Sequence, residues 1–196
     1  MKILINETVD KKTRTIINLD KQELIDRLAE DLGYVEVIPM DDVNSYVRIY
    51  FDIDQPDVSD DPLEKVLGMI SSKFACEKDS WSIASSHRSD KLSYHIVSNK
   101  FATQLKTLRR VTRQLKADYS VFDDKVLYFG LCDDLECGYF RLPNQTKRAL
   151  NKNAPPLTIV RGTIEDFFIT DVQSLVLSCY NGGAEYRTIS VETRYD

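Results

Sequence analysis

The sequence lacks long apolar runs, paired cysteine motifs and a phosphate-binding loop of the GxxxxGK type followed by Ser or Thr. No segment approaches the ~20 apolar residues that a membrane-crossing helix needs, and the first residues, MKILINETVDKK, are too polar for a signal peptide. We therefore expect an intracellular protein with no membrane partner. The four cysteines form no CxxC pair and the two histidines do not complete a zinc site, so we expect reduced cysteines without structural zinc.

The composition is that of an ordinary globular protein with an uneven distribution of charge. The 196 residues, 42% hydrophobic and 29% charged, are enough for one domain with a sizeable core. Residues 1–90 carry 11 Lys and Arg against 19 Asp and Glu, whereas residues 91–196 carry 15 against 12. A metal site beside a polyanion site would give this asymmetry, and so would a solvated surface. The net charge of −5 argues against indiscriminate coating of nucleic acid.

Hydrophobic periodicity predicts a mixed α and β chain. Asp20 and Glu23 have the spacing of a capping box, and Asp61 precedes Pro62 at the start of a second helical pattern. The expected helices cover residues 20–32, 60–77 and 102–116, and a short helix begins near Thr163. The expected strands cover residues 34–38, 46–53, 80–86, 92–98, 125–130, 138–142 and 173–179.

A linker is expected at residues 153–156, where the sequence reads Asn-Ala-Pro-Pro. It divides the chain into a core over residues 1–152 and a C-terminal extension, residues 153–196, that packs on the same domain.

The segment 46–54 alternates between apolar and polar side chains, as a strand with one buried face does. Asp52 and Asp54 fall on its polar face, ~7 Å apart along the strand, which is a separation that two bound cations can bridge. Two like charges so close repel each other unless a cation lies between them. A solvent-facing acidic strand end is the alternative interpretation.

Two further groups of polar residues suit the binding of phosphate. Lys91, Ser93 and His95 alternate with apolar residues on one predicted strand, and together they offer a point charge and two directional donors. Arg141 and Lys147 lie six residues apart and can each hold phosphate oxygens. A hydrogen-bonded structural histidine is the alternative for His95, and ordinary surface charge is the alternative for the other pair.

Two other sets of charges complete the candidate residues. Asp124 enters a predicted strand, where it can complete a site of three carboxylates. The predicted helix 102–116 carries an uninterrupted basic stripe that we interpret as a contact to a nucleic-acid backbone, with a solvated helix face as the alternative. The stripe consists of Lys106, Arg109, Arg110, Arg113 and Lys116.

Five segments that contain most of these candidate residues follow one another in an order that resembles the archaeo-eukaryotic primase superfamily. The resemblance is closest to the primase domains of large DNA viruses, the poxvirus-type primase-helicases, and to the eukaryotic primase-polymerases. The segments span residues 46–168 and read YVRIYFDID, SWSIASSHRSDKLSYHIVS, FDDKVLY, YFRLPNQTK and GTIEDFF. The resemblance implies an α+β fold, in which an RNA-recognition-like antiparallel sheet packs with helices and an additional α/β unit to form a single primase catalytic core.

The resemblance also implies roles for the candidate residues. Asp52, Asp54 and Asp124 would bind catalytic Mg²⁺ or Mn²⁺, with Asp123 as the alternative third carboxylate. The phosphates of an NTP or dNTP would be held by Lys91, Ser93, His95, Arg141 and Lys147.

The implied activity is DNA-templated primer synthesis on single-stranded DNA, by in-line attack of a 3′-hydroxyl on the α-phosphate. The implied place is the site of DNA replication, in a host cytoplasm or nucleus if the protein is viral, with a replicative helicase as a further partner. Without a motor or zinc module, the chain would be an excised domain or a free-standing small primase. The alternatives are a non-catalytic nucleic-acid-binding or scaffold subunit with the same fold, and a metal-dependent phosphoesterase.

Overall fold

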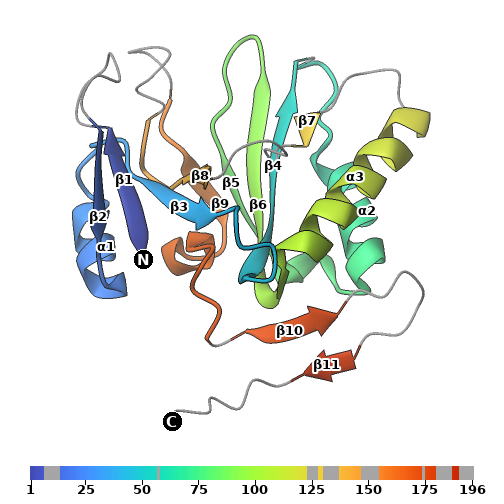
Figure 1. Ribbon diagram of the computed structural model, residues 1–196. Helices are drawn as coiled ribbons and strands as arrows, with labels where there is room; N and C mark the ends of the chain where they lie inside the picture. Colours follow the sequence, from blue (N-terminus) through green and yellow to red (C-terminus); the bar gives the residue numbers. More distant parts are fainter. Residues whose placement is uncertain are drawn as a thin grey trace.

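The computed structural model contains two β-sheets flanked by helices (Figure 1). The residues that it describes are 1–6, 14–56, 58–122, 128–129, 137–146, 155–173, 175–179 and 187–189. This arrangement confirms the expected α+β class.

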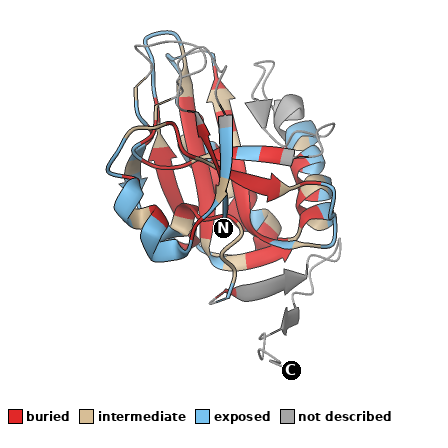
Figure 2. Ribbon diagram, turned by 60° about the vertical axis from the view of Figure 1, so that its left-hand side comes forward, coloured by how far each residue is buried: buried red, intermediate tan, exposed pale blue. Residues whose placement is uncertain are grey.

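The large sheet forms the centre of the molecule. It contains β4 (Tyr46–Gln55), β5 (Trp81–Ser85), β6 (Leu92–Gln104), β7 (Tyr128–Phe129), β9 (Thr158–Arg161), β10 (Val176–Cys179) and β11 (Arg187–Ile189). The strand order is β11-β10-β6-β4-β7, and β5 pairs with both β6 and β9. All pairs are antiparallel except β10 with β6. Strands β4, β5 and β6 are buried along most of their length (Figure 2).

The helices include α1 (Lys21–Arg27), α2 (Leu63–Phe74) and α3 (Leu105–Phe122), with short 3₁₀ turns η1 (Lys78–Ser80) and η2 (Ile164–Phe167). Figure 1 shows α2 and α3 on one side of the large sheet and α1 on the other side. No helix in the described part of the chain is long and apolar enough to span a membrane.

The small sheet packs through Phe140 against the face of the large sheet that is turned away from the long helices. It consists of β1 (Lys2–Asn6), β2 (Arg14–Asn18), β3 (Val35–Pro39) and β8 (Cys137–Arg141), in the antiparallel order β2-β1-β3-β8. We did not predict β1 or β2 from the sequence. Ile3 and Ile5 of β1 are buried together with Leu24 and Leu28, and this packing makes the short segment a strand.

Part of the main core lies between the large sheet and helices α2 and α3, and the same core includes Ile38 and Phe140 of the small sheet. The rings of Phe51, Phe74 and Trp81 meet there, with centroids 5.9–6.5 Å apart. The indole N–H of Trp81 donates to Ser71 Oγ at 2.9 Å, so the one polar atom of this fully buried ring is satisfied. The alternation of apolar residues along β4 therefore corresponds to burial against the helices.

Helix α2 lies within the expected range 60–77 but is shorter than it. Its first helical residue is Leu63 and its N-cap is Pro62, and the side chain of Asp61 supports this start because its Oδ1 accepts the N–H of Leu63 at 3.0 Å. Tyr94 Oη donates to the other oxygen of Asp61 at 2.7 Å and thereby ties the helix start to β6. Burial and the contact with Asp61 raise the pKa of Tyr94 well above its ordinary value.

Helix α1 is shorter than predicted, because a distant side chain ends it. The capping box of Asp20 and Glu23 is present, but the helix stops at Arg27 rather than at residue 32. Gln145, which is fully buried, donates to the carbonyl of Leu28 at 3.1 Å and accepts the N–H groups of Gly33 and Tyr34 at 3.1 and 3.2 Å. These bonds satisfy backbone groups that another helical turn would otherwise satisfy.

Helix α3 begins three residues later than predicted, because β6 is longer than its apolar pattern suggests. Residues Thr103 and Gln104 still pair with β4, opposite Val47 and Tyr46. The strand first passes an irregularity, at which Ser98 Oγ accepts the N–H groups of residues 100 and 101. The β4–β6 pairing therefore has an irregularity near Ser98, and β6 does not keep a simple alternation of apolar and polar side chains along its whole length.

The segment 155–173 packs against both sheets. Strand β9 pairs with β5, and Leu157, Phe167 and Ile169 belong to the main core. The same segment also contacts the small sheet, because Phe168 packs in the second core with Tyr34 and Leu142.

The small sheet is fastened to this segment by a buried carboxylate. Glu36 of β3 is fully buried and accepts the N–H groups of Ile169 and Thr170 and the hydroxyl of Thr170. Burial raises the pKa of Glu36, and the hydrogen bonds from Thr170 and Ile169 act in the opposite direction. The carboxylate of Glu36 thus accepts the hydrogen bonds of two amide groups in the turn 168–171.

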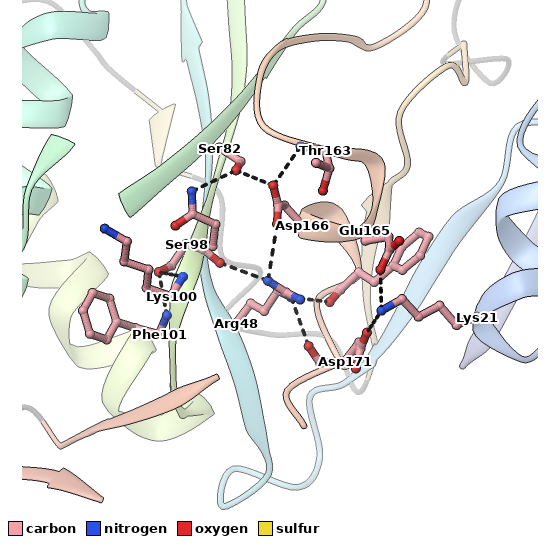
Figure 3. A network of polar contacts seen from close by, with 12 residues as sticks. Lys21, Arg48, Ser82, Ser98, Lys100, Phe101, Thr163, Glu165, Asp166 and Asp171 are labelled. Carbon is pink, nitrogen blue, oxygen red and sulfur yellow. Dashed lines mark hydrogen bonds and ion pairs between the residues drawn. The ribbon is translucent and has the colours of Figure 1, made fainter. Parts of the chain in front are cut away.

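The large sheet is fastened to the same turn by a buried guanidinium. Arg48 of β4 donates through Nε to the carbonyls of Phe168 and Asp171, both at 3.0 Å (Figure 3). Its Nη1 lies 4.0 Å from a carboxylate oxygen of Asp166, whose other oxygen accepts from Ser82 at 2.8 Å. Burial lowers the pKa of Arg48, whereas Asp166 and Asp171 act to raise it.

Substitution of Arg48 tests whether this connection stabilises the fold. Arg48→Met should lower the free energy of unfolding by about 3 kcal/mol, because it leaves buried carbonyls and Asp166 without their cation. Lys21→Met is the matched control, since Lys21 contacts Glu165 and Asp171 on the outer side of the same segment and is 44% exposed. It should cost less than about 1 kcal/mol. Urea denaturation measures both, and equal losses would contradict the assignment.

Candidate functional site

Asp52, Asp54, Ser93 and His95 lie together on the face of the large sheet that is turned away from α2 and α3. Asp52 pairs with His95 across the β4–β6 ladder, and Asp54 pairs with Ser93. Cross-strand partners point to the same face, so the two predicted polar rows become one cluster. The register brings these four residues together, which the separate strand patterns could not establish.

Direct contacts join the two carboxylates to residues of β6 and the turn before it. Lys91 Nζ lies 2.7 Å from Asp54 Oδ2, and His95 Nε2 lies 3.6 Å from Asp52 Oδ1. Lys91 and Asp54 are about one quarter exposed, whereas His95 is buried. Each carboxylate therefore has a basic side chain beside it.

Arg141 reaches the same cluster from the small sheet. It ends β8, and its Nη1 donates to Ser86 Oγ at 3.3 Å. Burial lowers the pKa of Arg141, whereas the negative charges of Asp52 and Asp54 act to raise it. The guanidinium thus lies within the electrostatic range of both carboxylates.

Ring packing aligns β8 with the large sheet at this point. Phe140 precedes Arg141, and its ring lies 4.5 Å from that of His95 and 5.2 Å from that of Tyr50. Phe140 and Tyr50 are both buried. The contact holds the end of β8 against β4 and β6, and hence determines where Arg141 can reach.

Ser86 is a site residue that we did not predict. Its hydroxyl donates to the carbonyl of Pro155 at 3.0 Å, so its oxygen is left to accept from Arg141. Its backbone N–H donates to the carbonyl of Ser93, and His87 Nδ1 accepts the N–H of Ser93 at 3.2 Å. Continuing the alternation of Ser82 and Ala84 by two residues would have placed Ser86 on the polar face.

The two carboxylates suit a hard divalent cation such as Mg²⁺ or Mn²⁺, which prefers oxygen ligands. Asp54 Oδ1 is buried and accepts no hydrogen bond from the described residues, so one charged oxygen remains available as a ligand. Within the described ranges, no three His, Cys, Asp or Glu side chains come together as a metal site. The predicted third ligand, Asp124, its alternative, Asp123, and the predicted phosphate ligand, Lys147, lie outside those ranges.

The basic stripe lies on a different surface from this cluster. α3 packs Leu108, Val111 and Leu115 against the helix face of the large sheet, whereas the carboxylates lie on the opposite face. The exposed residues of the stripe are Lys106, Arg110, Arg113 and Lys116.

Arg109 differs from the rest of the stripe. It is half-buried and donates through Nη2 to the carbonyl of Met40 at 3.0 Å. The nearby Lys106 donates to Asn44 Oδ1 at 2.9 Å. Arg109 therefore anchors the residues before β4 to α3, and it does not belong to the exposed part of the stripe.

No protein-family model and no curated protein sequence matches the chain.

Proposed function

We propose that the protein is a DNA-templated nucleotidyl transferase, a primase or primase-polymerase that joins NTPs or dNTPs on single-stranded DNA. The observation that carries the proposal is the convergence of Asp52 and Asp54 with Lys91, Ser93 and Arg141 from three strands and the adjoining turn. Carboxylates beside several cations are the combination that a metal-bound polyphosphate requires. In this proposal the large sheet is the RNA-recognition-like sheet of a primase core.

The residues of the cluster divide into two roles. Asp52 and Asp54 would hold a divalent cation, which would supply charge neutralisation at the reacting phosphate. Lys91 and Arg141 would bind non-bridging phosphate oxygens, and Ser93 and His95 would add directional hydrogen bonds. Asp124 and Lys147 would complete the two sets. These groups together would align the α-phosphate with an attacking 3′-hydroxyl, and pyrophosphate would leave.

The proposal includes a partner and a place. Single-stranded DNA would be the template, a replicative helicase would supply it, and the protein would act where DNA is replicated. A non-catalytic nucleic-acid-binding subunit is the second candidate, and one observation favours it. Lys91 and Arg141 balance the charges of Asp52 and Asp54 with groups of the chain itself, as in a purely structural polar cluster.

Asparagine substitution of the carboxylates tests the catalytic role. Asp52→Asn and Asp54→Asn should each lower nucleotide incorporation on a single-stranded template by about 100-fold or more, because they remove charge stabilisation at the reacting phosphate. Primer formation from labelled nucleotides with Mn²⁺ measures the effect. Asp90→Asn is the control, since it makes the same charge change on the exposed β5–β6 turn. Full activity of the double variant would exclude the polymerase mechanism, whereas template binding by an inactive wild-type protein would support the second candidate.

The exposed part of the α3 stripe should govern the salt dependence of template binding. Each phosphate contact on a single strand contributes about −0.7 to the slope of log K against log salt, so Arg110→Gln with Arg113→Gln should flatten it by roughly 1.4. The loss should be similar for every template sequence. Lys2→Gln with Arg27→Gln removes the same charge from exposed positions on the small-sheet side. Equal slopes for the two double variants would assign α3 to solvated surface.

A further inference from the structure

Lys91 contacts the carboxylate that a divalent cation would use. Its Nζ lies 2.7 Å from Asp54 Oδ2, while Asp54 Oδ1 is buried without a hydrogen bond from the described residues. A cation bound by Asp54 and an ammonium group on the same carboxylate carry like charges, and they repel each other because both lie against one side chain. Lys91 and the cation therefore compete for Asp54.

The formal charges of the cluster sharpen this competition. Asp52 and Asp54 contribute two negative charges, and Lys91 and Arg141 contribute two positive charges. A divalent cation alone would add two uncompensated positive charges beside Lys91 and Arg141. A triphosphate alone would add several negative charges beside Asp52 and Asp54. Each ligand offsets the repulsion that the other meets.

The two cations of the cluster differ in their freedom to move. Arg141 is held by Ser86, whose hydroxyl is itself fixed on the carbonyl of Pro155. Lys91 lies at the end of the β5–β6 turn, where its backbone pairs with Arg88, and its ammonium group has a flexible four-carbon stem. Lys91 can leave Asp54 for a nearby phosphate without a change in the backbone, whereas Arg141 stays in place.

We propose that the site binds a divalent cation and a triphosphate cooperatively, because Lys91 occupies Asp54 until the cation displaces it onto the phosphate. This inference rests on the proposed function, since it assumes that Asp54 holds the cation. Thermodynamic linkage requires each ligand to raise the affinity of the other by the same factor. Lys91 would then determine how strongly the cation and the triphosphate raise each other's affinity, in addition to being one of several phosphate ligands.

Three affinities measured on the purified chain test the proposal. Isothermal titration calorimetry gives the affinity for Mn²⁺ alone. Fluorescence anisotropy of a dye-labelled ATP gives the affinity for triphosphate, first with EDTA and then at saturating Mn²⁺. The variants are Lys91→Gln, Asp54→Asn and the control Lys100→Gln, which removes the same charge from an exposed pair with Asp79. Thermal unfolding confirms that each variant folds.

Lys91→Gln should bind Mn²⁺ alone about tenfold more tightly than the wild-type chain, an effect within the range usual for coupled ligands. The same variant should bind labelled ATP more weakly in EDTA. The factor by which Mn²⁺ raises the ATP affinity should therefore fall, by about tenfold. Lys100→Gln should match the wild-type chain in all three measurements.

Two other results would overturn the proposal, and they are distinguishable. If Asp54→Asn abolishes Mn²⁺ binding while Lys91→Gln leaves the Mn²⁺ affinity unchanged or weaker, Lys91 does not compete with the cation and the proposed function stands. If Asp54→Asn leaves Mn²⁺ binding intact with and without ATP, or the wild-type chain binds no Mn²⁺ in either condition, the proposed function fails as well.

Discussion

The turn 168–171 is held from both sides by buried charges, and the candidate site depends on this connection. Glu36 of the small sheet binds amide groups of the turn, and Arg48 of the large sheet binds its carbonyls. A buried charge without such partners would cost several kcal/mol, so the backbone of the turn is an essential partner for both side chains. The turn thereby connects the two sheets, and Phe140 of β8 packs on Tyr50 of β4 and His95 of β6. This packing brings Arg141 within the electrostatic range of Asp52 and Asp54.

Electrostatics constrains what the cluster can bind. Two carboxylates on alternate residues of one strand require nearby cations, and the chain provides Lys91 on a flexible stem and Arg141 on a fixed one. A ligand that brings both a cation and phosphate groups changes this balance least. Lys91 and Arg141, which neutralise the carboxylates, are also the residues that would bind the substrate, so they have a structural role as well as a proposed chemical role.

Local sequence patterns were sufficient to predict the strands β4 and β6 that bear the site, and also the start of α1. The alternation along β4 placed Asp52 and Asp54 on one face, and the spacing of Asp20 and Glu23 predicted the start of α1. The pairing of Asp52 with His95 depends on strand register, which no single-strand pattern contains. Ser86 was missed although it lies within the expected strand 80–86, because the alternation of Ser82 and Ala84 was not extended to it.

Long-range contacts determined most of what the sequence did not predict. Gln145 ends α1 through a carbonyl 117 residues away in the chain. β1 is a strand because its two isoleucines pack on α1, and the bulge near Ser98 delays the start of α3. The position of Arg141 within the electrostatic range of the carboxylates follows from the packing of one sheet on the other, whereas its expected role as a phosphate ligand came from its charge and from the resemblance.

Crystals grown with Mn²⁺ and a non-hydrolysable nucleoside triphosphate provide the most direct measurement of the central claim. Anomalous scattering locates Mn²⁺ independently of the protein model. We expect a peak in contact with the carboxylates of Asp52 and Asp54, with the triphosphate against Lys91 and Arg141. A saturated complex in which Mn²⁺ binds elsewhere, while Lys91 remains on Asp54, would contradict the account.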